Sequence, residues 1–66
     1  MSVAKTAEIT ASSSKSFEDA LRKGIDKMSK SVDNIEGAWV KEQKVVVSDG
    51  EISAYRVTMK VTFIVK

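Results

Sequence analysis

Residues 51–66, EISAYRVTMKVTFIVK, decide the fold of this chain. Apolar and polar side chains alternate along the segment, which is typical of a long β-strand with one buried face and one polar face. Ser48-Asp49-Gly50 just before it predicts a hairpin turn, so the strand pairs with the segment that precedes the turn. The apolar face carries Tyr55, Val57, Met59, Val61, Phe63 and Val65, and the polar face carries Arg56, Thr58, Lys60, Thr62 and Lys66.

The partner of that strand is predicted over residues 35–47, a valine-rich segment that contains Trp39. Apolar and polar side chains alternate only imperfectly along this segment. A β-bulge near Lys41–Lys44 would allow its two halves to belong to one continuous strand. Because strand side chains repeat every two residues, Gly37 and Trp39 are predicted to share a face, about 7 Å apart.

The first half of the chain predicts a strand over 3–11, a polar turn over 12–15 and an amphipathic helix over about 16–32. Ser16 is the predicted N-cap, and Asp19 is spaced to reach back toward it. Gly24 costs about 1 kcal/mol relative to alanine inside a helix, which suggests that it allows close approach to a strand.

The element order is therefore strand, helix, strand, strand. It predicts an α+β fold, in which a three-stranded antiparallel sheet with the last strand at its centre packs on one helix. We expect one domain over residues 1–66, because a chain of 66 residues is too short for two.

Size and element lengths predict self-association. A 17-residue helix spans about 25 Å, whereas a 15-residue strand spans about 50 Å, so one helix cannot cover the apolar face of such a strand. The chain has no cysteine, which excludes disulfides as support for so small a core. A symmetric homo-oligomer is the simplest way to cover the remaining apolar surface.

Composition argues against several classes of function. With no histidine, no cysteine and no recognisable carboxylate pair, the chain is not expected to be an enzyme or to hold a transition metal. A net charge of +2 does not predict nucleic-acid binding. No apolar run is long enough to span a membrane, and a cytoplasmic location is the expectation. Calcium at Asp49-Gly50-Glu51 stays open as an alternative.

Four segments of the chain stand out by their residues and their spacing: Ser16-Phe17-Glu18-Asp19-Ala20, Ser31-Val32-Asp33-Asn34-Ile35, Val40-Lys41-Glu42-Gln43 and Tyr55-Arg56-Val57-Thr58-Met59-Lys60-Val61-Thr62-Phe63. At this spacing they resemble the dodecins, small β-α-β-β proteins that assemble into hollow dodecamers. The resemblance covers about residues 3–66 and implies the same fold and assembly.

The resemblance also implies a flavin site. In the best-known dodecins a tryptophan shortly after the helix stacks on the flavin ring, and a glutamine beside the last strand's aromatic residue hydrogen-bonds the ring edge. Gly37 and Arg56 occupy these two positions here, and Trp39 lies two residues beyond the first. The helix is also preceded by Thr10-Ala11-Ser12-Ser13 instead of the usual Gly-Thr-Ser pattern. The chain thus resembles a variant branch of the family.

Two functions remain open from the sequence. One is binding and storage of a small ligand within a hollow homo-oligomeric shell, with flavin (FMN, riboflavin or FAD) as the first candidate ligand. The other is a structural or interaction oligomer that holds no flavin, with a cation such as calcium as an optional ligand. The residues expected at a ligand site are Trp39, Gln43, Arg56 and Gly37.

Overall fold

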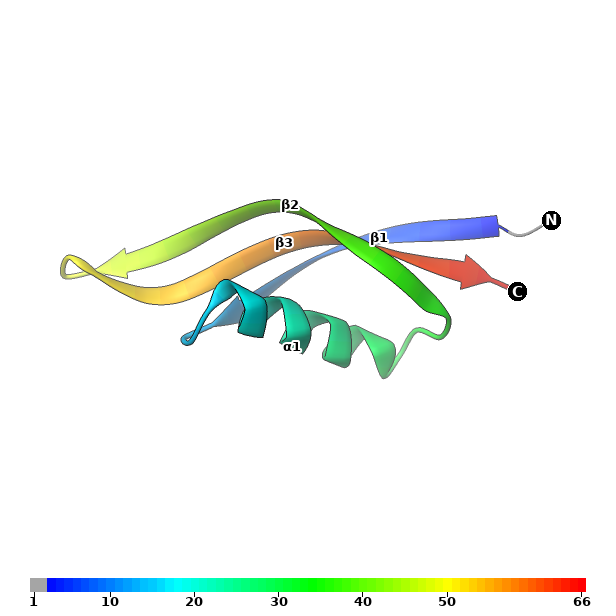
Figure 1. Cartoon of the computed structure of the whole chain (residues 1–66), viewed down its shortest axis with the longest axis horizontal. Helices are drawn as coiled ribbons and strands as arrows, with labels where there is room; N and C mark the ends of the chain where they lie inside the picture. Colours follow the sequence, from blue (N-terminus) through cyan, green and yellow to red (C-terminus); the bar gives the residue numbers. More distant parts are fainter. Residues whose placement is uncertain (1–2) are drawn as a thin grey trace.

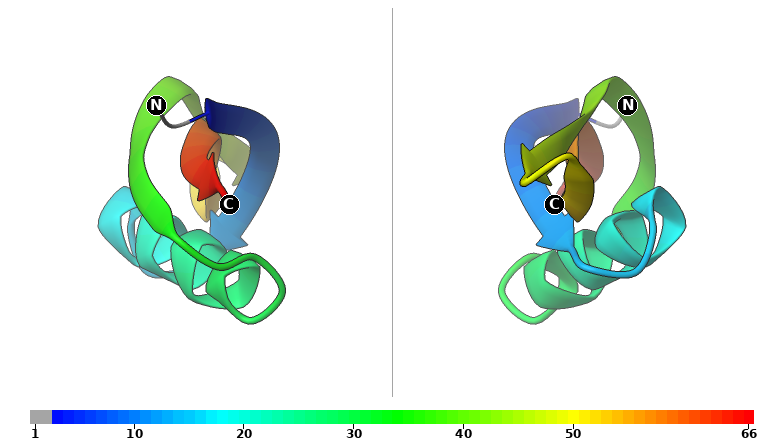
Figure 2. Two further views of the ribbon diagram at one scale, coloured as in Figure 1. Left: turned by 90° about the vertical axis from the view of Figure 1, so that its right-hand side faces the viewer. Right: turned by 90° about the vertical axis from the view of Figure 1, so that its left-hand side faces the viewer.

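The computed structural model describes residues 3–66, and its elements are β1 (Val3–Ser13), α1 (Phe17–Ser29), β2 (Ile35–Ser48) and β3 (Glu51–Val65) (Figure 1). The strands form an antiparallel sheet in the order β1-β3-β2, and α1 lies on one side of it (Figure 2). The predicted α+β architecture, with the last strand in the centre, is confirmed. Residues 1–2 of the predicted 1–66 domain lie outside the described residues.

Two predicted boundaries are wrong by two or three residues. β1 continues through Ser12 and Ser13, because these residues pair with Arg56 and Tyr55 of β3 instead of forming a turn. The helix ends at Ser29 and not near residue 32. Its last turn tightens, since the backbone N–H groups of Lys30 and Ser31 donate to carbonyls three residues earlier.

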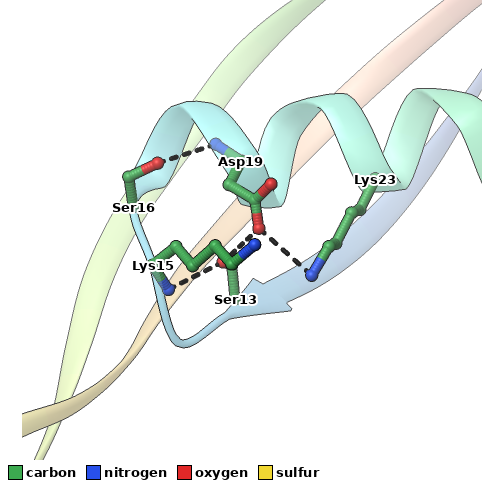
Figure 3. A network of polar contacts seen from close by, with 5 residues as sticks. All are labelled: Ser13, Lys15, Ser16, Asp19 and Lys23. Carbon is green, nitrogen blue, oxygen red and sulfur yellow. Dashed lines mark hydrogen bonds and ion pairs between the residues drawn. The ribbon is translucent and has the colours of Figure 1, made fainter.

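At the start of the helix, the predicted N-cap residue Ser16 is confirmed, but the Asp19 carboxylate does not make the predicted contact. The Ser16 hydroxyl accepts the Asp19 backbone N–H at 2.9 Å, as an N-cap should. The Asp19 carboxylate does not reach back to the cap. It accepts the Ser13 hydroxyl at 2.5 Å and pairs with Lys23 at 3.1 Å (Figure 3). The Ser13 hydrogen bond, followed by Lys23, lowers the pKa of Asp19 below its usual value.

The core lies where α1 crosses the central strand. Val57, Met59 and Val61 of β3 are fully buried together with Ala20 of α1. Gly24 faces the same strand, and a Cβ built on it would lie 2.8 Å from Met59 Cε and 3.1 Å from Ala11 Cβ. The predicted close approach at Gly24 is therefore confirmed.

The β2–β3 hairpin departs from regular pairing and ends in a tight turn. Register shifts occur at Ile35/Gly37, Val40/Glu42 and Val46/Val47. The second confirms the bulge expected near Lys41–Lys44 and places it at Lys41. Asp49 and Gly50 both have positive φ, 52° and 76°, which is the conformation of a type I′ turn.

β2 is left uncovered by the helix. α1 packs on β1 and β3, and the hairpin end projects beyond it (Figure 1). The molecule is 52 Å long, whereas a 13-residue helix spans about 20 Å. Along β2 and the hairpin, the helix side has four large apolar residues that are exposed, named here the apolar strip: Val40, Val45, Val47 and Ile52.

Candidate ligand-binding site

The side of the sheet that faces away from α1 is named here the open face. Residues directly opposite one another in an antiparallel ladder point to the same side, so the register defines the open face row by row. Each row takes one residue from each strand, in the order β1, β3, β2. The rows are Ser12–Arg56–Lys44, Thr10–Thr58–Glu42, Glu8–Lys60–Trp39 and Thr6–Thr62–Gly37.

Trp39 is the large aromatic residue of the open face, and 52% of it is exposed. The Lys60 ammonium lies 5.7 Å from the centroid of its ring, within the range of a cation–π contact. An exposed indole ring on an otherwise polar surface is suited to stacking on a flat ligand.

Gly37 lies one row from Trp39, and the register puts both residues on the open face, as their two-residue spacing predicts. A Cβ built on Gly37 would meet no atom within 4 Å among the described residues. The sheet therefore offers free space beside the indole ring, at the position where the dodecin resemblance expects a tryptophan.

Arg56 and Gln43, the other two expected site residues, lie on opposite faces. Arg56 pairs with Lys44 and points to the open face, whereas Gln43 pairs with buried Val57 and points to the helix side. In a regular strand Gln43 would share the face of Trp39, four residues earlier. The bulge at Lys41 reverses that alternation. The register thus places Gly37, Trp39 and Arg56 on the open face, with Arg56 two rows from Trp39, and places Gln43 on the other face.

A cross-sheet ion pair lies next to the tryptophan, and the sequence did not predict it. Lys41 Nζ lies 3.3 Å from Glu8 Oε1, although their strands are separated by β3. Glu8 stands in the same row as Lys60 and Trp39. Because the bulged residue has no direct partner in the ladder, simple alternation could not assign Lys41 to a face.

Metal-binding side chains do not cluster in the part of the chain that the structure describes. Among residues 3–66, no three acidic, histidine or cysteine side chains gather closely enough to hold a metal ion. On the open face, the hydroxyls of Thr10 and Thr58 lie within hydrogen-bond distance of each other, at 3.1 Å. The site can stack, donate hydrogen bonds and neutralise negative charge.

Arg56 limits how a flavin would be held. A flavin ring edge presents carbonyl oxygens and one N–H, and a glutamine satisfies both kinds of group. A guanidinium only donates, so Arg56 suits the carbonyl oxygens but leaves the N–H without an acceptor. The open face therefore fits a flavin ring in part.

The fold and this face define a small β-α-β-β protein with an exposed aromatic ring on a polar sheet. The sequence model of the family described as Dodecin matches residues 3–66, and the chain belongs to the dodecin family. No protein of curated function shows significant similarity to it. None of the helices in the described part of the chain is long and apolar enough to cross a membrane.

Solved dodecin structures superpose on nearly the whole chain. Dodecin from Streptomyces davaonensis is 29% identical with a TM-score of 0.94, over 98% of this chain and 96% of that one. A point mutant of the dodecin of Thermus thermophilus shares the fold at 21% identity and a TM-score of 0.95, covering 100% and 98% of the two chains.

A third similar structure is described together with a ligand, calcium. It is the calcium dodecin of Mycobacterium tuberculosis, described as a calcium-chelating immunodominant antigen with a novel calcium-binding site. It is 34% identical with a TM-score of 0.85, over 97% of this chain and 91% of that one. The family is thus established, and one of its members is described as binding calcium.

Proposed function

We propose that this chain is a ligand-binding and storage dodecin that holds a flat aromatic ligand on the open face, with flavin as the first candidate. The observation that carries the proposal is the half-exposed Trp39 ring next to the free space at Gly37. Stacking on one aromatic side chain is worth about 1–3 kcal/mol, enough to bias binding toward flat ligands.

The proposal includes a homo-oligomeric shell, with the dodecamer of the family as the expected size. Four exposed apolar residues in one strip are unusual for a sheet surface of so small a protein, and a partner subunit would remove them from water. The role is binding and not catalysis, and a cytoplasmic location is part of the same proposal.

The test is a titration of riboflavin with the purified oligomer, followed by flavin fluorescence. We expect quenching at micromolar protein concentrations in the wild type, and a loss of about 5- to 150-fold in affinity in Trp39→Ala, the equivalent of 1–3 kcal/mol. Light scattering on the variant serves as the control, because its oligomer mass should not change. Absence of quenching by the wild-type protein would refute the flavin proposal.

The alternative function is a structural oligomer without a flat ligand, and the apolar strip is the observation that favours it. In that case Trp39 packs against a neighbouring subunit, and Trp39→Ala lowers the oligomer mass instead of removing a ligand. The same two measurements therefore separate the two functions.

Calcium binding is a further alternative, suggested by the calcium-binding relative from Mycobacterium tuberculosis. Asp49 and Glu51 at the hairpin supply two carboxylates, fewer than a protein calcium site usually has. A melting temperature that rises with added calcium but not with magnesium would support this alternative. A melting curve that calcium leaves unchanged would exclude it.

A further inference from the structure

The Lys60 ammonium and the Trp39 indole form a pair across two strands of the open face. The two residues stand directly opposite each other on β3 and β2, and the ammonium lies over the indole ring, 5.7 Å from its centroid. Lys60 is half-buried, whereas 52% of Trp39 is exposed. The electron-rich face of the ring attracts the cation, and this is the same kind of surface on which a flat ligand stacks.

The acid nearest in the ladder is already paired with another lysine. Glu8 stands opposite Lys60 on β1, but its carboxylate lies 3.3 Å from Lys41 Nζ. None of the ion pairs found within residues 3–66 includes Lys60. The two lysines and the one glutamate therefore leave an excess of one positive charge beside the indole ring.

Lys60 and a stacked ligand compete for the same face of the indole. A ring that takes this face must first displace the ammonium. The lysine can move aside, because its charge sits on a flexible four-carbon stem. A neutral ring offers the ammonium nothing in place of the lost cation–π contact. A ring that carries a negative group replaces that contact with a charge-assisted hydrogen bond, which is about twice as strong as a neutral one.

We propose that Lys60 is a specificity-determining residue, and that the Trp39–Lys60 pair selects flat aromatic ligands with a negative charge on or beside the ring, such as aromatic carboxylates. This inference rests on the proposed function, because it names the class of flat ligand that the open face prefers. The free space at Gly37 receives the ring, and Lys60 supplies the partner for its charge. An uncharged ring such as that of riboflavin still stacks, but it gains nothing from Lys60.

The test compares two planar probes of nearly equal shape, the anion 2-naphthoate and the neutral 2-naphthamide. Their affinities for the purified protein are measured by calorimetry at pH 7 and low ionic strength, where charge interactions are least screened. Lys60→Gln removes the charge, and Lys60→Arg keeps it. Lys5→Gln is the matched control, since it removes the same charge from a sheet residue that pairs with Phe63 on the helix side.

We expect the wild type, Lys5→Gln and Lys60→Arg to bind 2-naphthoate at least about threefold more tightly than 2-naphthamide, a gain typical of one partly exposed charge pair. In Lys60→Gln this preference should vanish, while 2-naphthamide binds as well as in the wild type or better, because no ammonium then covers the indole. Specificity is a difference between two affinities. Damage to the stacking surface would instead weaken both probes alike.

Equal affinities of the wild type for the two probes, or a preference that Lys60→Gln retains, would overturn the inference, as would failure of both probes to bind. If circular dichroism shows that Lys60→Gln does not fold, Lys60→Thr is the second uncharged variant, with the residue type that stands on either side along the same face at Thr58 and Thr62. Riboflavin quenching without a preference between the probes would refute this inference and leave the proposed function standing. A preference for 2-naphthoate without riboflavin binding would support this inference and refute the flavin candidate.

Discussion

Gly24 of α1 and Met59 of β3 meet where the helix crosses the sheet, so closely that a Cβ on Gly24 would lie 2.8 Å from Met59 Cε. Met59 is fully buried and cannot swing into solvent to make room. The Cβ of Ala11, 3.1 Å from the same point, has no rotamer to change. A glycine that weakens the helix locally thus sets the distance between helix and sheet.

Gly24→Ala is expected to destabilise the fold. At an exposed helical site the same change raises the free energy of unfolding by about 1 kcal/mol. Overpacking a close contact lowers it by about 1–3 kcal/mol. We therefore expect Gly24→Ala to lower the free energy of unfolding by about 1 kcal/mol. Chemical denaturation measures the difference. Lys27→Ala, at an exposed position of α1, is the control and should stay within about 0.5 kcal/mol of the wild type. A stabilised Gly24→Ala variant would contradict the packing argument.

Asp19 makes the stability of the helix start depend on pH. The Ser13 hydrogen bond and Lys23 favour its charged form, so its pKa in the folded protein lies below the ordinary 3.8. A lowered folded-state pKa means that this contribution is complete above about pH 4. It is lost as the pH falls through the folded-state value and the carboxylate takes up a proton.

Asp19→Asn should therefore lower the melting temperature at pH 7, and the gap to the wild type should close progressively below about pH 4. Melting curves between pH 7 and pH 2 make the comparison. Asp26→Asn removes the same charge from an exposed i,i+4 pair with Lys30 and should cost little, as surface pairs do. A gap that stays constant down to pH 2 would show that Asp19 acts through something other than its charge.

The fold was predictable because local patterns and the global arrangement agree. The alternation over residues 51–66 required a central strand with one buried face, and Val57, Met59 and Val61 are buried as expected. The misplaced boundaries are those that depend on tertiary pairing. Ser12 and Ser13 have turn-forming side chains, yet they continue β1 because β3 offers them partners.

The site was less predictable because a single bulged residue decides which side chains share a face. Trp39 and Gly37 precede Lys41 and keep their predicted relationship, whereas Gln43 follows it and points to the helix side. The sequence indicated a bulge over Lys41–Lys44, but its face assignments depend on which residue bulges. Lys44 was missed for that reason, since only the register places it opposite Arg56.

A charge in the apolar strip is expected to weaken the oligomer. Val47 is 59% exposed and pairs with Ile52 close to the hairpin turn. The hairpin end projects beyond α1 (Figure 1). Val47→Glu should lower the mass measured by light scattering, because a buried carboxylate without a partner is costly. Ser48→Glu adds the same charge at the next residue, with the opposite orientation, and should leave the mass unchanged. A Val47→Glu variant with wild-type mass would show that the strip lies outside the subunit interface.

Gly37→Trp tests whether the open face retains the shape of a stacking site. No described atom lies within 4 Å of the added Cβ, and the φ of Gly37 is not positive, so the strand should accept the side chain without strain. A second ring beside Trp39 should tighten riboflavin binding by about 5- to 150-fold, the equivalent of 1–3 kcal/mol of stacking. Ala38→Trp is the matched control, because Ala38 pairs with Val61 and its side chain leaves the sheet on the helix side. If Gly37→Trp binds riboflavin no better than this control, the free space at position 37 is not part of a ring-binding site.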